Sequence, residues 1–281
     1  MRGSLRVETA MAGGYDMKKD IRKELLLIIP AYNEEKNIGG LLDRMREDGI
    51  FELADVLVMN DASKDRTASI AASHGARVIT HVYNLGYGSG LQLGYKYARK
   101  NGYQYLIQMD ADGQHDVCNV KTIYDLLKRQ DEDGNRPDIV LGSRFVEGAP
   151  GYPTSLVKKL AYSIFRFFIR LGTGKKYMDP TTGLQGLSRR AFCFYAGYNH
   201  FDDMYPDANM IMQMTLLGFS VKEVPAVMHP RTEGKSMHSG LKPFVYMFRM
   251  TFSIIAVWVR IRLYKVDVGA INEFSETDLI Q

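Results

Sequence analysis

The sequence predicts an α/β protein with a mostly parallel β-sheet that is covered by helices on both faces. Five short apolar runs alternate with stretches of helical periodicity along the first half of the chain. The runs are apolar almost throughout, as in strands buried on both faces, whereas a strand with one solvated face alternates apolar and polar residues. Regular alternation of strands and helices then places the connecting helices on the two faces of a parallel sheet.

The individual elements follow in chain order. Strands are expected at residues 25–30, 55–60, 76–80, 105–109 and 138–142, where short apolar stretches are bounded by turn-forming residues. Helices are expected near residues 34–47, 65–74, 88–101 and 117–128. Two further strands, at 183–188 and 220–227, are expected around a helix near 207–217.

Polar, turn-forming residues follow each of the first five predicted strands. In chain order these segments are AYNEE, NDASKD, YNLGYGSG, DADGQH and SRF. Ligands of open α/β sheets bind at the carboxyl ends of the strands. The sequence therefore predicts a ligand site along that edge of the sheet.

An acidic triplet, Asp110-Ala111-Asp112, follows the fourth predicted strand. Two carboxylates at positions i and i+2 repel each other unless a cation lies between them. Mg²⁺ is commonly held by one or two carboxylates together with the phosphates of a substrate. The triplet is therefore a candidate metal site, and the alternative is a solvated acidic turn.

The glycine-rich segment YNLGYGSG matches neither of two common phosphate-binding loops. A P-loop requires Gly-Lys-Ser/Thr, which is missing, and a dinucleotide-binding motif would follow the first strand, where the chain has AYNEE. Gly86, Gly88 and Gly90 are expected to let a helix begin close to the ligand or the sheet, with packing alone as the alternative.

Composition narrows the class of protein. The 281 residues are 46% hydrophobic and 24% charged, which is ordinary for a globular protein. Cys118 and Cys193 provide neither a disulfide framework nor a Cys-x-x-Cys metal pair, which favours a reducing cytosolic setting. Residues 1–23 lack an apolar signal-peptide core and are expected to be a leader or a disordered arm.

The net charge of +4 is unevenly distributed along the chain. Residues 155–178 and 234–266 are rich in aromatic residues, and each contains six Lys or Arg and no acid, so the rest of the chain is acidic. A nucleic-acid-binding protein is not usually arranged in this way, and no nucleic-acid partner is expected. The pattern favours a domain that docks on an anionic membrane surface.

Both basic segments have the pattern of amphipathic helices. One stripe of the helix expected at 155–178 is apolar: Leu160, Ile164, Phe167 and Leu171. The C-terminal segment offers lipid-compatible side chains: Phe244, Phe248, Phe252, Ile255 and Trp258. Only ten residues separate Arg249 from Arg260, whereas a membrane span needs ~20 apolar residues. We therefore expect a helix in the plane of the membrane interface, with a core or dimerisation helix as the alternative.

Six sequence blocks occur together in order and at suitable spacing. They are IIPAYNEE, NDASKDRT, YNLGYGSG, MDADGQH, DIVLGSRF and DPTTGLQGLSRRAF. Over about residues 24 to 240 the chain resembles the inverting family-two glycosyltransferases, which have the Rossmann-like GT-A fold. The resemblance is specifically to the dolichol/polyprenyl-phosphate mannosyl- and glucosyltransferase-like branch. It implies a nucleotide-sugar donor, a divalent metal (Mg²⁺ or Mn²⁺) and transfer of a sugar with inversion.

The resemblance also implies roles for individual residues on the donor side. It places Pro30, Tyr32 and Glu34 in the nucleotide pocket, with Asp61 near the base. A fixed cation near the diphosphate would stabilise the charge that develops on this leaving group.

The implied metal site lies in the MDADGQH block. Asp110 and Asp112 hold the metal on the diphosphate, Ala111 lies between them, and Gln114 supports the site. His115 is expected either to take part in the site or to cap the following helix.

The candidate catalytic residues are Asp112, Arg144, Asp207 and Arg231. The two arginines are implied to interact with phosphate or acceptor charge, or, as the alternative for Arg144, to pair with a surface acid. Lys235 and Ser236 are implied to contact the donor or the acceptor.

Three positions depart from the family pattern. Asn60 stands where an acid is usual, and Asn209 stands where relatives often have Glu, which leaves Asp207 as the nearest carboxylate. Near EGKS relatives often have Gly-x-Ser-Lys, but here Lys235 precedes Ser236.

The class of acceptor depends on whether the chain supplies a general base. An alcohol must lose a proton to react, whereas a lipid monophosphate is already anionic and needs cations instead. The candidate bases are Asp202, Asp203 and Asp207, and none lies in a Glu-Asp motif. The basic segments supply cations and apolar surface together, which favours the lipid phosphate.

These expectations combine into a glycosyltransferase that acts on a polyprenyl phosphate and is peripheral at the inner, cytoplasmic face of the cell membrane. Residues 1–23 would be a leader, 24–240 the GT-A domain and 241–281 an amphipathic helix and tail, and homo-oligomerisation is left open. One alternative is a glycosyltransferase acting on a saccharide or protein hydroxyl, as in cell-surface polysaccharide synthesis. Another is a non-catalytic sugar-nucleotide-binding subunit. A nucleotidyltransferase is disfavoured, because the glycine-rich triphosphate loop is missing after the first strand.

Overall fold

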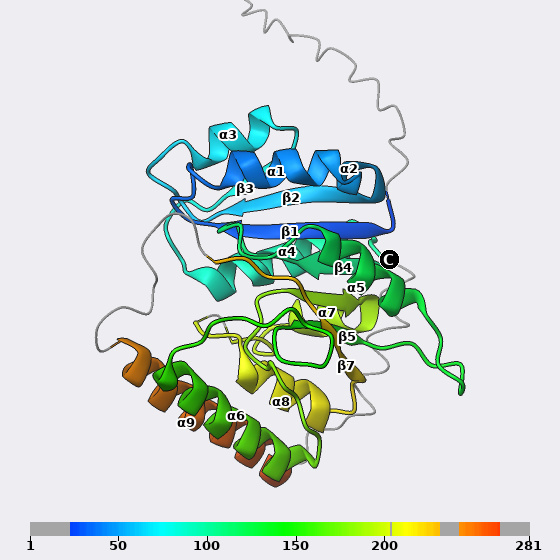
Figure 1. Ribbon diagram of the computed structural model, residues 1–281, viewed down its shortest axis with the longest axis vertical. Helices are drawn as coiled ribbons and strands as arrows, with labels where there is room; N and C mark the ends of the chain where they lie inside the picture. The colour runs from blue at the N-terminus through cyan, green and yellow to red at the C-terminus, as the bar shows by residue number, and fades with distance from the viewer. Residues whose placement is uncertain (1–22, 203, 231–241, 265–281) are drawn as a thin grey trace, which may run out of the picture.

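The computed structural model describes residues 23–202, 204–230 and 242–264. Within them, a seven-stranded sheet has the order β3-β2-β1-β4-β6-β5-β7 (Figure 1). The strands are β1 (Leu25–Ala31), β2 (Ala54–Asn60), β3 (Arg77–Thr80), β4 (Tyr105–Gln108), β5 (Ile139–Ser143), β6 (Gln185–Ser188) and β7 (Val221–Pro225). Neighbouring strands are parallel except at β6, which runs antiparallel to both β4 and β5. The sheet is mostly parallel, as predicted.

Strand β1 shows why the sequence forms this sheet. Its residues, LLLIIPA, are buried except for the half-buried Pro30. Successive side chains of a strand point to opposite faces. Leu25 and Leu27 accordingly join one hydrophobic core, while Leu26 and Ile28 join another. A strand between two cores has no polar face, so its sequence is a continuous apolar run.

Helices cover both faces of the sheet. They are α1 (Ile38–Glu47), α2 (Ile50–Leu53), α3 (Thr67–Ser73), α4 (Tyr87–Lys100), α5 (Cys118–Lys128), α6 (Leu156–Thr173), α7 (Arg189–Tyr195), α8 (Ala208–Leu216) and α9 (Lys242–Tyr264). Buried side chains of α1, α2, α3 and α5 complete the core of one face. Those of α4 and α6 to α9 complete the core of the other. Every predicted strand and helix is present, with boundaries shifted by a few residues.

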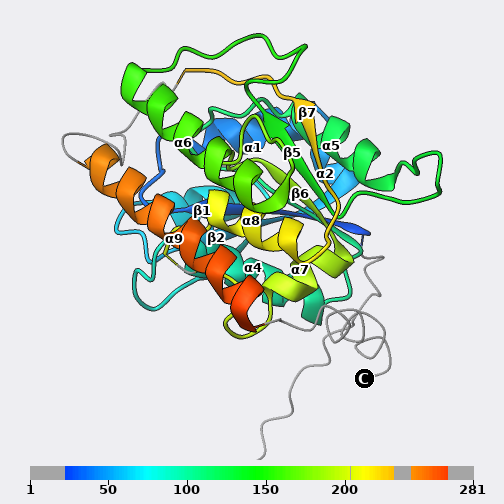
Figure 2. The same cartoon turned by 90° about the horizontal axis from the view of Figure 1, so that it is seen from below.

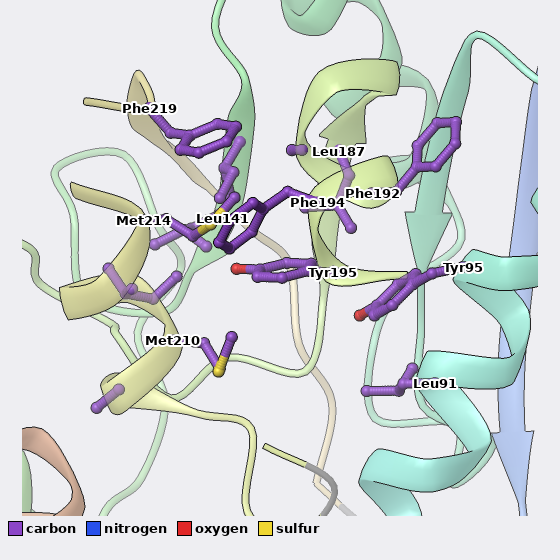
Figure 3. Close-up of a cluster of buried hydrophobic side chains, with 14 of the residues drawn as sticks. Leu91, Tyr95, Leu141, Leu187, Phe192, Phe194, Tyr195, Met210, Met214 and Phe219 are labelled. Atoms are coloured by element: carbon purple, nitrogen blue, oxygen red, sulfur yellow. The ribbon is translucent and has the colours of Figure 1, made fainter. Parts of the chain in front are cut away.

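The second core depends on a short helix that the sequence did not predict. Figure 3 shows Phe194 and Tyr195 of α7 between α4 and α8, while Phe192 points toward the sheet. The ring of Tyr195 lies 5.5 Å from that of Tyr95 of α4, measured between centroids. The four-residue helix α2 was likewise not expected. The four residues of α2 are too few to show a helical period in the sequence.

Helices α6 and α9 lie side by side at the end of the molecule farthest from α1 to α3 (Figures 1 and 2). Helix α6 begins after Ser155, whose hydroxyl accepts a hydrogen bond from the Lys158 N–H. It ends at Gly174, whose φ of 71° is the left-handed conformation that terminates many helices.

The helix pair exposes many apolar side chains to solvent. Most of the stripe predicted on α6 faces solvent, with Leu160, Phe167 and Leu171 exposed. Four of the five lipid-compatible residues predicted on α9 are also exposed: Phe244, Phe248, Phe252 and Trp258. Among the described residues, one helical segment, Phe244–Leu263, has the length and apolar composition of a membrane span.

Candidate active site

The carboxylate of Asp110 lies just beyond β4 and is held from two sides. The Tyr87 hydroxyl, at the start of α4, donates a 2.9 Å hydrogen bond to Oδ1. The His115 Nε2 atom lies 3.6 Å from Oδ2. Burial alone would raise the pKa of Asp110, but the hydrogen bonds from these two residues outweigh it, and the pKa is lowered below its ordinary value. The site therefore presents an ionised carboxylate with a fixed orientation.

A glycine makes room for this carboxylate. Gly183 lies in the turn that leads into β6, and a β-carbon at that position would lie 2.1 Å from Asp110 Oδ2. Because β6 is antiparallel, its first residues reach the same edge of the sheet as the carboxyl end of β4. The antiparallel strand thus brings the DPTTG sequence against the acidic triplet.

The turn after β4 fixes the rest of the acidic triplet. Gly113 adopts φ 73°, and the following N–H, of Gln114, donates a 3.1 Å hydrogen bond to Asp112 Oδ1. The Gln114 side-chain amide donates to the hydroxyl of Tyr152 at 2.6 Å. Ala111 is buried between the two carboxylates. The triplet is therefore an ordered turn.

The donor set fits a weakly held divalent cation. Asp110 and Asp112 offer oxygen ligands, and among the described residues no group of three or more His, Cys, Asp or Glu side chains could form a complete metal cage. Mg²⁺ is typically bound by one or two carboxylates together with substrate phosphates and water. These two aspartates are thus the residues that would hold the metal, with a diphosphate supplying further ligands.

His115 does not cap the helix that follows it. The N–H of Cys118, at the start of α5, donates to Asp116 Oδ1 at 2.9 Å, so Asp116 has that role. His115 is buried and faces Asp110, and its Nδ1 has no hydrogen-bond partner in the described part of the chain. Of the two interpretations offered by the sequence, its place beside Asp110 favours a part in the site.

Asp61, expected near the nucleotide base, is buried at the end of β2 and holds the next loop. Its carboxylate accepts hydrogen bonds from the N–H groups of Leu85 and Gly86, each 2.8 Å long. Its Oδ1 also lies 2.8 Å from His81 Nδ1. Asp61 therefore shapes the glycine-rich loop that precedes α4.

The residues after β1 lie on the same edge of the sheet. Tyr32 is exposed, and the Glu34 N–H donates to the Thr67 hydroxyl at 2.8 Å. The Glu34 carboxylate accepts a 2.6 Å hydrogen bond from Asn37. Pro30 pairs in register with Met59 of β2, so the loops after both strands begin side by side. The predicted nucleotide-pocket residues thus gather at the edge that carries the acidic triplet.

Arg144 forms a buried ion pair instead of pairing with a surface acid. Its Nε and Nη2 atoms each lie 2.6 Å from one oxygen of Asp179, which is fully buried. The guanidinium also lies over the rings of Phe145, Tyr152 and Tyr162. Burial lowers the pKa of Arg144, but the hydrogen bonds and charge of Asp179 outweigh it and raise the pKa above its ordinary value. Arg144 is thus a fixed cation.

Asp207 lies at the N-terminus of α8, where the Tyr246 hydroxyl of α9 donates to its Oδ2 at 2.5 Å. Burial is the main reason that the pKa of Asp207 is raised to about 6. The charge of Asp110 raises it further, while Tyr246 and the charge of Arg144 lower it. The charges of Asp110 and Arg144 therefore both influence the pKa of Asp207.

Several predicted site residues lie outside the described residues. They are Asp203, Arg231, Lys235 and Ser236. Four contacts to the predicted residues were missed by the sequence interpretation: those of Tyr87, Asp179, Gly183 and Tyr246. The first three lie within the quoted sequence blocks, so their segments were flagged although their roles were not. Tyr246 had no such signal, because its contact with Asp207 joins residues 39 positions apart.

Known proteins resemble the chain in both sequence and fold. The profile of the family described as "Glycosyl transferase family 2" matches residues 26–194. Undecaprenyl-phosphate mannosyltransferase of Micrococcus luteus is 31% identical, over 77% of this chain and 88% of that protein. Polyprenol monophosphomannose synthase of Mycolicibacterium smegmatis is 25% identical, over 80% and 84%.

A solved structure shares the fold. Glucosyl-3-phosphoglycerate synthase from Mycobacterium tuberculosis, crystallised with Mn²⁺, UDP and glucosyl-3-phosphoglycerate, superposes with a TM-score of 0.58. It is 18% identical, and the match covers 86% of this chain and 80% of that one. The structural likeness assigns the GT-A fold, and the family match makes the protein a sugar-transferring enzyme. The chain belongs to glycosyl transferase family 2, and the resemblance found in its motifs is confirmed.

Proposed function

We propose that the protein transfers a sugar, with inversion, from a nucleotide-sugar donor to a polyprenyl phosphate at a membrane surface. One structural observation carries the proposal. The turn with Asp112 and the ionised Asp110, together with the fixed cation Arg144, belongs to the same fold as the exposed apolar residues of α6 and α9. A diphosphate donor requires the charged groups of the site, and a lipid acceptor requires the apolar surface.

On the donor side, the acidic turn is suited to a diphosphate with its metal ion. Tyr87 and His115 orient Asp110, and Gly183 leaves space for its carboxylate. A bound Mg²⁺ or Mn²⁺ would neutralise the charge that develops on the departing nucleoside diphosphate. The solved relative crystallised with Mn²⁺ and UDP supports this assignment.

On the acceptor side, two observations support a lipid phosphate. The exposed apolar residues of α6 and α9 lie on adjacent helices in segments that contain six bases each and no acid. Such a surface suits an anionic lipid interface. Two relatives are named for mannosyl transfer involving undecaprenyl phosphate and polyprenol monophosphomannose.

The geometry of α9 supports attachment in the plane of the interface. This helix packs along α6 and α8, and its polar side chains form hydrogen bonds with α8 and the segment before it. A helix crossing the bilayer alone would give up those contacts. We therefore propose peripheral attachment to the membrane, and we keep the cytoplasmic face as the side expected from the sequence.

A second candidate function is sugar transfer to a hydroxyl acceptor, because Asp207 could serve as the general base. A hydroxyl acceptor requires a general base whose pKa lies near the working pH. The pKa of Asp207 is raised to about 6, and its carboxylate lies within the electrostatic influence of Asp110. Transfer to a saccharide hydroxyl would use Asp207 in that role.

The test is a panel of GDP- and UDP-sugars scored for nucleotide release with and without polyprenyl phosphate in anionic vesicles. The expected result is release that depends on one donor and on the lipid phosphate, and that Asp112→Asn abolishes. Release that requires a saccharide hydroxyl instead, and disappears in Asp207→Asn, would replace the lipid acceptor with the second function. Tight donor binding without any release would indicate a non-catalytic binding subunit.

A further inference from the structure

One line of polar side chains on α9 contacts the segment that carries Asp207. Tyr246, Ser253 and Arg260 follow at intervals of seven residues, so they lie on one face, about two turns apart. The Tyr246 hydroxyl donates to Asp207, and Ser253 Oγ accepts a 2.8 Å hydrogen bond from the Asn209 amide.

The same face continues along α8. Arg260 donates a hydrogen bond to Gln213 of α8. The guanidinium of Arg249 lies 5.9 Å from the ring centroid of Tyr205. Helix α9 is thus joined by polar contacts to the whole segment from Tyr205 to Gln213.

The buried side chain of Asn209 forms hydrogen bonds that stabilise the segment from Tyr205 to Gln213. It is buried, and its amide donates to Asp202 at 2.7 Å as well as to Ser253. Its Oδ1 accepts from the N–H groups of Asp207 and Met210. One side chain therefore fixes the turn around Asp207 and ties that turn to α9.

The opposite face of α9 is apolar and exposed. Phe244, Phe248 and Phe252 follow at intervals of four residues and form a ridge, and the last two are 61% and 68% exposed. The helix therefore connects a lipid-compatible ridge with the polar line that contacts Asp207.

We infer that Tyr246 is a positioning residue that fixes the Asp207 carboxylate beside the acidic triplet and Arg144, so that seating α9 on a lipid surface sets the alignment of the acceptor. The inference rests on the proposed function, since it concerns the acceptor of that reaction. In this inference Tyr246 acts through Asp207, to which its hydroxyl donates.

The test compares Tyr246→Phe, which keeps the ring and loses the hydroxyl, with Tyr205→Phe on the neighbouring segment. Each variant and the wild type are assayed with a short, water-soluble prenyl phosphate, with and without anionic vesicles that contain no acceptor. Vesicles are expected to raise the wild-type kcat/KM for the acceptor. Tyr246→Phe should lose that gain, lowering kcat/KM by about tenfold, since a hydrogen bond to a charged group contributes more than a neutral one. Donor affinity should stay unchanged in both variants, and Tyr205→Phe should behave as the wild type.

Two further readouts do not depend on transfer. Trp258, the single tryptophan of the chain, lies on α9 and reports vesicle binding by its fluorescence. Amide hydrogen exchange of residues 204–209 should slow when wild-type protein binds vesicles, and should not slow in Tyr246→Phe even though Trp258 shows equal binding.

The outcomes separate the two proposals. If the wild type transfers to prenyl phosphate and Tyr246→Phe keeps both the vesicle-dependent gain and the slowed exchange, the inference is wrong and the proposed function stands. If the wild type uses no prenyl phosphate, the proposed function fails. The exchange measurement then still decides whether α9 controls the Asp207 segment.

Discussion

Gly183 approaches the Asp110 carboxylate so closely that a methyl group cannot be added without moving one of them. A β-carbon at position 183 would lie 2.1 Å from Oδ2 and 2.7 Å from Cγ of Asp110. The carboxylate is the end of a side chain and can swing aside at little cost to the fold. Gly183→Ala is therefore expected to weaken metal-dependent nucleotide affinity by about tenfold or more while changing the free energy of unfolding little. Calorimetric titration of nucleotide with Mn²⁺, beside urea unfolding, measures both.

The matched control is Gly40→Ala. A β-carbon at Gly40, an exposed position of α1, would meet only the end of the Arg44 side chain, at 3.8 Å, so this variant should keep wild-type nucleotide affinity. Equal affinity in both variants would contradict the placement of Asp110 at the donor site.

The acidic pair is expected to bind the metal productively only together with a diphosphate. Two carboxylates without further protein ligands hold Mg²⁺ or Mn²⁺ weakly. Calorimetry should show nucleotide affinity that rises with the metal and falls when the metal is removed by chelation. Asp112→Asn should remove most of the metal-dependent gain, whereas Asp125→Asn on the exposed face of α5 should not. Unchanged affinity in Asp112→Asn defeats the metal assignment.

Removing Arg144 from its ion pair with Asp179 is expected to lower both the stability of the fold and the rate of transfer. Arg144→Ala leaves Asp179 buried without its cation, and breaking a buried pair in this way typically costs about 3–5 kcal/mol. Urea unfolding should show a loss of that order, and below the melting temperature transfer should slow more than nucleotide binding weakens. Arg170→Ala, at an exposed position of α6, should change stability by less than about 0.5 kcal/mol. An unchanged stability of Arg144→Ala would mean that the pair is not formed in solution.

Asp207 makes the stability of the fold depend on pH. Its pKa is raised from the ordinary value of 3.8 to about 6, chiefly by burial and further by the charges of Asp110 and Asp202. The folded state therefore holds this proton more tightly than the unfolded state, so the resulting stabilisation is present at low pH and is lost as the pH rises through about 6. Asp207→Asn removes the titration. The free energy of unfolding of this variant, relative to the wild type, should increase between about pH 4 and about pH 6 in urea titrations and level off at higher pH. A difference that is flat across this range would count against the raised pKa.

The exposed ridge of α9 offers the sharpest membrane test. Arg249 and Arg260 contact Tyr205 and Gln213, so reversing their charge would also disturb α8 and the segment before it. Phe248→Glu with Phe252→Glu changes only exposed positions, and should reduce binding to anionic vesicles by about tenfold or more.

Co-sedimentation with anionic and neutral vesicles measures this binding. Wild-type binding should weaken with salt but persist in part, because buried apolar area is not screened. Val82→Glu changes an equally exposed apolar residue on the loop after β3 and should leave vesicle binding intact. If the wild type ignores anionic vesicles at low salt, the interfacial assignment of α9 fails.

The sequence predicted those features that depend on local pattern. Continuous apolar runs such as that of β1 identify strands covered on both faces, because neither buried face of such a strand accommodates polar side chains. The antiparallel direction of β6 was not predictable in this way, since the residues of a strand do not encode which neighbour it will pair with. At the site, the acidic triplet lies within one short segment and was recognised.

The contacts that hold the site were harder to predict. Arg144 and Asp179 are 35 positions apart, and Tyr246 lies 39 positions beyond Asp207. Such pairs form only when separate helices and loops meet in the folded protein. The sequence therefore identified the individual residues as members of motifs or helices, but it did not show which residues contact each other. The stripe on α6 was recognised by its spacing, but only the structure shows that residues such as Phe167 face solvent.

The single antiparallel strand also bears on the order in which the protein is made. Strands β4 and β5 are not neighbours, and each pairs on its inner side with β6, which follows them in the sequence. During synthesis, both strands leave the ribosome before the segment that joins them. Unpaired strand edges invite association with other chains, and domains generally begin to fold from the N-terminal side. The nascent protein therefore carries the open edge of β4 and an unpaired β5 until β6 is made, and β5 gains its second partner only with β7.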